Sequence, residues 1–336
     1  MKTGSVLITG GAGYIGSHAV LACREAGHSI VVLDNLSKGN REVLPNDVPF
    51  YQGDAGDPTI IARIIKGHSV TAVMHFAGEI VVPESVEAPL SYYLSNTCKS
   101  RALLQSCVDH GITSFVFSST AAVYGEPDVN PVGEGAPTRP ENPYGRSKLM
   151  VEWMLRDAAR AHGLRYVILR YFNVAGADCA GRAGQSAPGA THLIKVACEV
   201  AVGKRPEMEI FGTDYDTRDG TCVRDFVHVS DLANAHVLAL EHLWRGGENL
   251  TLNCAYGHGH SVREVLDAIQ HIAGRPLAIR NAPRRAGDVG SLIAEASRLR
   301  DVLGWVPEYD SLDVILRTAL HWEQRVTAWK VKGDAT

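Results

Sequence analysis

The 336-residue chain lacks several features that would decide its class at once. It has no apolar run of about 18 residues, the length that a membrane-spanning helix needs. No signal peptide stands ahead of its first strand-like segment, "SVLITGG". The formal net charge of −4 provides no basic footprint for nucleic acid or anionic lipid. We therefore expect a soluble, cytoplasmic protein with neither a nucleic acid nor a membrane as its partner.

Metal-binding and disulfide patterns are missing as well. The seven cysteines are odd in number, widely spaced and form no CxxC, which favours reduced thiols over a disulfide framework. The 14 histidines form no HExxH and no paired ligand cluster. The sequence therefore predicts no metal site.

The first half of the chain alternates apolar runs with helical patterns. The runs are rich in Val, Ile and Phe and show no polar alternation, which is typical of strands buried on both faces of a parallel sheet. They are "SVLIT", "SIVVL", "AVMHFA", "SFVFSS" and "RYVILRYF". Repeated βαβ units predict an α/β fold, a Rossmann-type doubly wound parallel sheet.

After Asn173 the chain turns glycine-rich and aperiodic in "VAGADCAGRAGQSAPGA", which suits a loop that enters a second region. We expect residues 1–178 to form the dinucleotide-binding domain, with residues 226–256 returning to it. Residues 179–225 and 257–336 are then expected to form a smaller, interleaved α/β substrate domain.

A glycine loop joins the first predicted strand to the first predicted helix. Gly10, Gly13 and Gly16 in "TGGAGYIGSH" permit a tight turn and the close approach of a pyrophosphate to backbone N–H groups. Asp34 ends the second strand, where a carboxylate accepts hydrogen bonds from ribose hydroxyls and repels a 2′-phosphate. This combination predicts NAD, rather than NADP, as the cofactor.

A phenol and an ammonium lie four residues apart in "NPYGRSK". Pro143 suits a first helical turn, so Tyr144 and Lys148 are expected on one face of a helix. A solvated surface pair is the plain interpretation. The alternative is an acid/base phenol whose pKa is lowered by a fixed cation. A Ser-Ser-Thr run that ends at Thr120, just beyond a buried strand, adds hydroxyls where such sheets build their sites.

Taken in chain order, these motifs resemble the extended short-chain dehydrogenase/reductase family and, within it, the UDP-glucose 4-epimerase (UDP-galactose 4-epimerase) branch. The resemblance covers nearly the whole chain and is most specific in "RYFN" and "DGTCVRDFVHV". It implies NAD-dependent interconversion of UDP-glucose and UDP-galactose, by inversion at carbon 4 through a 4-keto intermediate. It also suggests a homodimer, for which the helices around 98–109 and 147–162 are candidates.

The resemblance implies a role for individual residues. Tyr144 would remove the proton from the sugar's 4-hydroxyl, Thr120 would relay it, and Lys148 would bind the nicotinamide ribose and lower the pKa of the phenol. Further residues implied to contact the cofactor are Gly10, Gly13, Tyr14, Ile15, Gly16, Asp34, Asn35, Leu36, Ser37, Gly39, Asp54, Ala55, Phe76, Ala77, Gly78, Ile80, Ser95, Asn96, Ser118, Ser119, Tyr171 and Phe172. Those implied to hold the UDP-hexose are Asn173, His192, Leu193, Glu209, Phe211, Arg224, Arg285, Asp288 and Leu292. For Arg224 and Arg285 the side-chain chemistry supports this role, because the paired N–H donors of a guanidinium fit the oxygen atoms of a diphosphate.

Four positions depart from the family pattern. Ile80 replaces a common lysine near the nicotinamide, Ser95 replaces the first of an Asn-Asn pair, and His192 stands where Asn is common. Leu292 falls where narrow-specificity epimerases have a bulky Tyr. A smaller side chain there would admit UDP-N-acetylhexosamines.

Three other functions remain open. A sugar-nucleotide 4,6-dehydratase shares the fold, but it needs an acid and a base where this chain has Ala121 and Ala122. An epimerase of another UDP-sugar, such as UDP-xylose, UDP-arabinose or a UDP-uronate, is a second possibility. A non-catalytic NAD-binding regulator is the third, although it would have no need of Thr120, Tyr144 and Lys148 together.

Overall fold

The five uninterrupted apolar runs belong to one parallel sheet of seven strands. In this computed structural model, which describes residues 4–187, 189–285 and 288–333, the strand order is β11-β6-β5-β4-β1-β2-β3. The strands are β1 (Ser5–Thr9), β2 (Ile30–Asp34), β3 (Phe50–Gln52), β4 (Val70–His75), β5 (Ser114–Thr120), β6 (Arg165–Tyr171) and β11 (Leu250–Cys254). The predicted doubly wound fold is confirmed, including each of the five predicted strands. The short edge strand β3, which is only partly buried, was missed.

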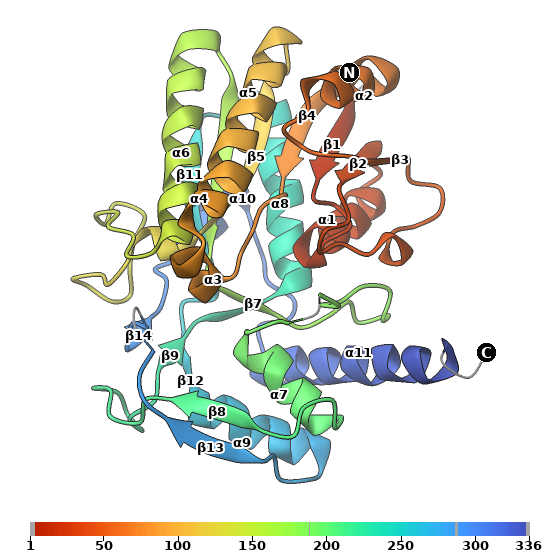
Figure 1. Cartoon of the computed structure of the whole chain (residues 1–336). Coiled ribbons are helices and arrows are strands. Elements are labelled where there is room, and N and C mark those ends of the chain that lie inside the picture. The colour runs from red at the N-terminus through yellow and green to blue at the C-terminus, as the bar shows by residue number, and fades with distance from the viewer. Residues whose placement is uncertain (1–3, 188, 286–287, 334–336) are drawn as a thin grey trace.

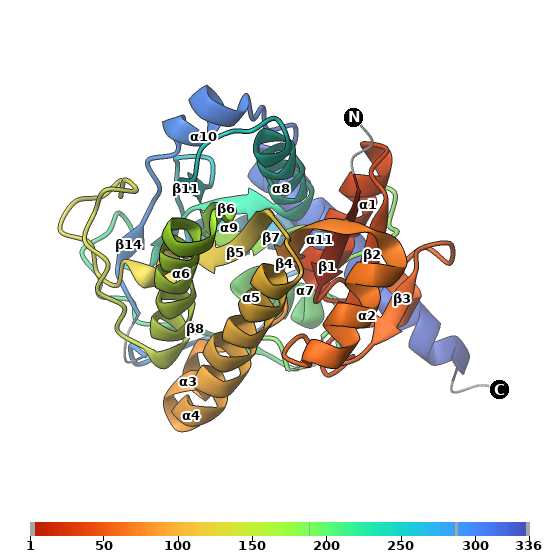
Figure 2. The ribbon, with the colours of Figure 1, turned by 90° about the horizontal axis from the view of Figure 1, so that it is seen from above.

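Helices cover both faces of this sheet (Figure 2). On one face α1 (Tyr14–Glu25) lies against α8 (Val229–Trp244), and Val6 and Ile8 of β1 point into that layer. The other face carries α2 (Pro58–His68), α5 (Lys99–Asp109) and α6 (Pro143–His162), and it receives Leu7. Successive residues of β1 therefore enter opposite layers, as the pleat of a strand requires.

The second region lies below the sheet in Figure 1 and has three longer helices that pack on one another: α7 (Leu193–Ala201), α9 (Val262–Ala273) and α11 (Leu312–Gly333). Its short sheets are β7 (Asn173–Ala175) with β10 (Phe226–His228), β8 (Met208–Phe211) with β13 (Ile279–Ala282), and β9 (Val223–Arg224) between β12 (His260–Ser261) and β14 (Ser291–Leu292). The remaining elements are η1 (Arg41–Val43), α3 (Val82–Glu87), α4 (Pro89–Tyr92), the π-helix η2 (Tyr93–Cys98), η3 (Ala121–Val123) and α10 (Ser297–Leu303).

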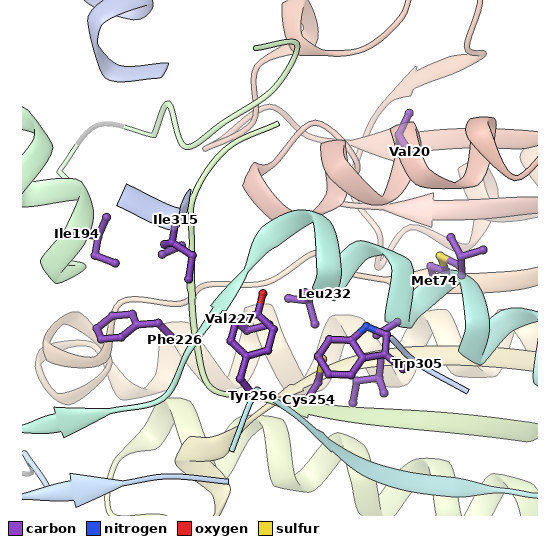
Figure 3. Close-up of a cluster of buried hydrophobic side chains, with 14 of the residues drawn as sticks. Val20, Met74, Ile194, Phe226, Val227, Leu232, Cys254, Tyr256, Trp305 and Ile315 are labelled. Carbon is purple, nitrogen blue, oxygen red and sulfur yellow. The ribbon is translucent and has the colours of Figure 1, made fainter. Parts of the chain in front are cut away.

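The two regions share one hydrophobic core, seen in Figure 3. Val20 and Met74 belong to the large sheet and its helical layer, whereas Ile194 and Ile315 come from α7 and α11. Because these side chains form a single cluster, the core fixes the position of the second region against the sheet.

The chain leaves the large sheet and returns to it. After β6 it builds α7, β8 and β9, and only then supplies α8 and β11, which pairs with β6. The division into 1–178 with 226–256, and 179–225 with 257–336, stays a prediction. The outer ends of these ranges, 1–3 and 334–336, lie outside the described residues. In the part of the chain that the structure describes, no helix is both long and apolar enough to cross a membrane.

Candidate active site

The glycine loop lies where the sheet order reverses direction. β1 has β4 on one side and β2 on the other, so the crevice of the doubly wound sheet opens at the carboxyl ends of β1 and β4. Gly10 has a φ of +71°, and a Cβ placed there would lie 2.5 Å from the backbone nitrogen of Ala77. Both the left-handed backbone and the close approach of the two strand ends require glycine at this position.

The N-terminus of α1 is open toward this crevice. Gly13 is its N-cap, and among the described residues no side chain caps its first N–H groups. The first turn also contains no acidic residue. Unpaired N–H groups and the positive end of the helix dipole favour an anion here, so the loop fits a pyrophosphate. The phenol of Tyr14 itself donates to the Gly176 carbonyl oxygen, 2.7 Å away, which leaves its backbone to face the crevice.

Asp34 organises the end of β2. Its carboxylate oxygens accept hydrogen bonds from the backbone N–H groups of Ala12 (2.9 Å) and Leu36 (2.8 Å). A Cβ on Gly39 would lie 2.9 Å from the same carboxylate, so the loop after β2 folds back over it. Burial raises the pKa of Asp34, while the two backbone hydrogen bonds lower it. The carboxylate retains further lone pairs for ribose hydroxyls.

The next predicted adenosine contacts are already paired within the chain. Asp54 accepts a hydrogen bond from Lys99 Nζ at 2.5 Å and another from the Gly56 N–H at 2.8 Å. Asn35 accepts from the Ser37 N–H at 3.0 Å. These side chains shape the loops beside Asp34.

Tyr144 and Lys148 lie on the buried face of α6. The Asn142 side chain caps this helix by accepting from the Gly145 N–H at 2.9 Å, and Pro143 opens the first turn. Tyr144 is 7% exposed and Lys148 is 3% exposed. The interpretation as a solvated surface pair is therefore wrong. Tyr144 forms a hydrogen bond with Thr120.

Burial shifts the pKa values of both Tyr144 and Lys148. Burial raises the pKa of Tyr144, and the hydrogen bond with Thr120 lowers it only in part. Burial also lowers the pKa of Lys148 to about 8. The Lys148 ammonium donates to the carbonyl oxygen of Ser118, 3.0 Å away. The predicted fall in the phenol's pKa is therefore wrong for this structure, because desolvation of the phenolate outweighs the hydrogen bond with Thr120.

The Ser-Ser-Thr run ends β5 and does not follow it as predicted, and its three hydroxyls go to three different places. Ser119 donates to Glu152 Oε1 at 2.6 Å, inside a buried ion pair between Glu152 and Arg170. Ser118 is bonded to His236 of α8, with 2.8 Å between Oγ and Nε2. Only Thr120 lies beside Tyr144. Sequence reasoning missed His236 and the ion pair, since one histidine or glutamate in a helix pattern gives no signal of its partner.

Asn96 holds the segment after β4 in place. Its Oδ1 accepts from the Glu79 N–H at 2.7 Å, while Nδ2 donates to the Glu79 carbonyl and to Ser147 Oγ, both at 3.0 Å. A Cβ on Gly78 would lie 2.7 Å from Asn96 Oδ1 and 3.7 Å from Lys148 Nζ. Asn96 thus fixes the loop that passes beside Lys148.

Other predicted contacts with the nicotinamide lie around this segment. Phe76 and Ala77 directly follow β4, and Ile80 is 45% exposed. Ser95 lies half-buried in η2. Tyr171 is the strand partner of Thr120.

The predicted UDP-sugar residues gather in small groups at the second region. Arg224 and Leu292 are strand partners in the pairing of β9 with β14. The Arg285 guanidinium lies 4.3 Å from the ring centre of Phe211, and its Nε donates to Asp288 at 3.0 Å. These pairs bring residues far apart in sequence side by side.

The other predicted substrate contacts have partners of their own. Asn173 pairs with Phe226 between β7 and β10. His192 precedes Leu193 at the start of α7 and accepts at Nδ1 from the Gln185 amide, 2.9 Å away. Burial lowers the pKa of His192. Glu209 is instead paired with Arg280, at 2.6 Å.

No group of three or more His, Cys, Asp or Glu side chains within 4–187, 189–285 and 288–333 is placed to hold a metal ion. All seven cysteines fall inside these ranges and are free thiols.

We predict that Lys148→Met raises the free energy of unfolding at pH 7 by about 1–3 kcal/mol, because it removes a charge that burial disfavours. The folded-state pKa is about 8, against an ordinary 10.5. Between these values the unfolded chain binds more protons, so wild-type stability rises and the gain should shrink toward pH 10. Urea unfolding of both proteins at pH 7 and pH 10 measures this. Lys66→Met, at an exposed position of α2, should change stability by no more than about 0.5 kcal/mol at either pH. A variant less stable than wild type at pH 7 would contradict the prediction.

Comparison with known proteins assigns the chain to a family. Residues 6–255 match the model of the NAD dependent epimerase/dehydratase family. UDP-glucose 4-epimerase of Azospirillum brasilense is 60% identical over 95% of this chain and 92% of its own length. The crystal structure of UDP-glucose 4-epimerase from Brucella ovis in complex with NAD has a TM-score of 0.93 and 43% identity, covering 96% of this chain and 99% of that one. The Stenotrophomonas maltophila enzyme with bound NAD and formylated UDP-arabinopyranose also scores 0.93, at 40% identity and over 97% and 99% of the two chains. The chain belongs to the NAD dependent epimerase/dehydratase family.

Proposed function

We propose that this protein interconverts UDP-glucose and UDP-galactose by NAD-dependent inversion at carbon 4. The observation that carries the proposal is the buried Tyr144, with Thr120 and Lys148 beside it, at the carboxyl end of β5 in the same sheet as the glycine loop. Relatives at up to 60% identity over 95% of the chain are UDP-glucose 4-epimerases, which supports the same reaction here.

The chain's own residues fit NAD. The first turn of α1 supplies N–H groups for the pyrophosphate, and Asp34 supplies acceptors for the adenosine ribose. The chemistry that NAD supplies when bound is acceptance of a hydride from carbon 4 and its return to the opposite face.

Tyr144 is the proposed acid/base. Its phenolate oxygen takes the proton of the 4-hydroxyl and later gives it back, with Thr120 in hydrogen-bonding contact to relay it. Because burial raises the pKa of this phenol, its ionisation needs positive charge at the site. Lys148 supplies one such charge from the same helix face, and the oxidised nicotinamide is a second.

The UDP group anchors the substrate while the hexose turns. Arg224 and Arg285 offer guanidinium donors to the diphosphate, and Phe211 lies under Arg285 at the same subsite. Inversion requires the 4-keto sugar to present both faces, so the binding free energy belongs on the nucleotide rather than on the hexose.

Dehydration is disfavoured by the residues after Thr120. Ala121 and Ala122 form the short turn η3 there, and neither side chain can transfer a proton. Elimination of water needs an acid and a base at this place.

The two regions divide the binding task in this proposal. Residues 1–178 with 226–256 hold NAD, and residues 179–225 with 257–336 hold the UDP-sugar. The seven free thiols support a cytoplasmic enzyme.

Leu292 supports acceptance of UDP-N-acetylhexosamines. It lies half-buried beside the apolar cluster that contains Ala121, Val123 and Phe172. Leucine leaves more room than tyrosine for an acetamido group on carbon 2, so both sugar classes become substrates.

An apolar surface supports a homodimer. Leu90 of α4 is 79% exposed, Leu94 of η2 is 57% exposed and Trp153 of α6 is 51% exposed. The elements that carry them lie in contact, since both α4 and η2 pack on α6. Large apolar side chains gathered on neighbouring elements mark an association surface. It includes the helix predicted around 147–162, and η2 leads directly into the helix predicted around 98–109.

One prediction concerns turnover without added cofactor. Purified protein incubated with UDP-galactose alone should form UDP-glucose, because NAD stays bound throughout the cycle. Tyr144→Phe should lower kcat by a factor on the order of 100 to 10,000, since the acid/base is lost. Tyr51 lies on β3, where its hydroxyl is hydrogen-bonded with His68 of α2, and Tyr51→Phe should keep full activity. A protein that contains NAD but leaves UDP-galactose unchanged would refute the function.

Leu292→Tyr tests sugar specificity. We expect turnover of UDP-N-acetylgalactosamine to fall at least about tenfold relative to UDP-galactose, because a bulky ring occupies the acetamido space. Initial rates with the two sugars measure the ratio. If the wild-type protein does not turn over UDP-N-acetylglucosamine at all, the broader specificity is wrong.

The double variant Leu94→Glu/Trp153→Glu tests the dimer. Two carboxylates in an apolar interface should dissociate it, so sedimentation velocity should give the mass of two chains for wild type and of one chain for the variant. Val306→Glu, exposed at a site between α10 and α11, should stay dimeric. Wild-type protein that sediments as a single chain would exclude the dimer.

A further inference from the structure

His236 is a fully buried histidine that the proposed reaction does not use. It lies in α8, which packs on β5 and β6 from the face opposite α6. Its imidazole is 4.7 Å from the ring centre of Phe76 and 6.5 Å from that of Tyr171. These two rings follow β4 and end β6, the strands on either side of β5. His236 therefore sits under the strand ends that form the crevice.

The hydrogen bonds of His236 fix its tautomer. Nδ1 lies 2.8 Å from the carbonyl oxygen of Leu232, which can only accept, so Nδ1 carries the hydrogen. Burial lowers the pKa of His236 to about 4, so the ring is neutral at physiological pH and Nε2 is an acceptor. The Ser118 hydroxyl, 2.8 Å from Nε2, must therefore donate to it.

Ser118 connects this histidine to the proposed catalytic groups. While its hydroxyl is bonded to His236 on one face of the sheet, its carbonyl oxygen accepts from Lys148 Nζ at 3.0 Å. The Ser118 hydroxyl also hydrogen-bonds with Tyr171, whose ring contacts His236. One residue at the end of β5 thus joins α8, β6 and α6.

We propose that His236 is a positioning residue for the proposed reaction: it holds the Ser118 hydroxyl, so that the Ser118 carbonyl keeps the Lys148 ammonium beside Tyr144. The proposed role rests on the function proposed above and concerns how the Lys148 ammonium is held in position.

The physical need for such a support lies in Lys148. A lysine side chain has four flexible carbons, and burial disfavours its charge, so a fixed acceptor decides where the ammonium rests. Ser118 lies near the carboxyl end of β5, where β6 still pairs with the strand but β4 no longer does, since the last pair with β4 is His75 with Phe117. Without an acceptor at Nε2, the buried Ser118 hydroxyl keeps only its hydrogen bond with Tyr171, and its reorientation disturbs the carbonyl that Lys148 contacts. A displacement near 1 Å at a reacting group costs large factors in rate.

His236→Leu removes the acceptor and keeps an apolar side chain in the layer. We expect kcat for UDP-galactose to fall on the order of tenfold, with KM changed less than about twofold. The rise of kcat with pH should move to higher pH, because a displaced ammonium supports the Tyr144 phenolate less. The profile is macroscopic, since Lys148 also faces His75 from β4 and Tyr144 also faces Tyr171.

His236→Gln is the matched rescue variant. Its amide oxygen reaches the place of Nε2 and can accept from Ser118, so kcat and the pH profile should stay close to wild type. His242→Leu, the same replacement six residues along α8, should also leave both unchanged. Ser118→Ala should lower kcat as His236→Leu does, and the double variant should fall no further, because both act through one hydrogen bond.

A spectroscopic titration separates this inference from the proposed function. The ultraviolet difference between each protein and its Tyr144→Phe derivative follows ionisation of Tyr144 without any turnover. His236→Leu should raise the apparent pKa of Tyr144, and His236→Gln should not. If both variants titrate like wild type, or if His236→Gln fails as His236→Leu does, the positioning role is wrong. A protein that shows the titration shift but does not epimerise UDP-galactose would retain the positioning and lose the function.

Discussion

The geometry of the proposed active site depends on a buried cation, the ammonium of Lys148. Lys148 is almost fully covered, its pKa is lowered to about 8 by burial, and its ammonium donates to the main-chain carbonyl of Ser118. An ammonium in this environment is costly and is kept only where its charge has a use. The proposed use is to support the phenolate of Tyr144, which burial alone would disfavour. Both pKa shifts come from the same desolvation, which disfavours the charged form of each group.

Two buried networks hold the end of β5 between α6 and α8. On the side of α6, Glu152 binds Arg170 of β6 through both carboxylate oxygens and accepts from Ser119. On the side of α8, the Ser118 hydroxyl is held by His236. Adjacent serines point to opposite faces because side chains alternate along a strand. Hydrogen bonds from both helical layers thereby hold the end of β5 in place. Thr120, the next residue, is hydrogen-bonded with Tyr144.

Much of the fold and part of the site could be predicted because the signals are local. The five longest sheet strands of the first half are continuous apolar runs, and the glycine spacing before α1 marks a phosphate turn. The short strand β3 was missed because its half-exposed residues carry no such pattern. The role of Asn96 was beyond sequence reasoning too, since its amide is bonded to Glu79 and Ser147 through contacts that only folding creates.

The sequence by itself determined which groups are available: a glycine loop, an acidic strand end, a Tyr and a Lys one helical turn apart, and an assignment to one family. Periodicity and motif spacing are properties of residues close together in the sequence, so they can be read without a structure. Only the tertiary structure decided that Tyr144 and Lys148 are buried, which way their pKa values shift, and that Ser118 links them to His236, 118 residues away along the chain. Burial and long-range hydrogen bonds depend on how distant segments pack, and desolvation then sets the charge of each group.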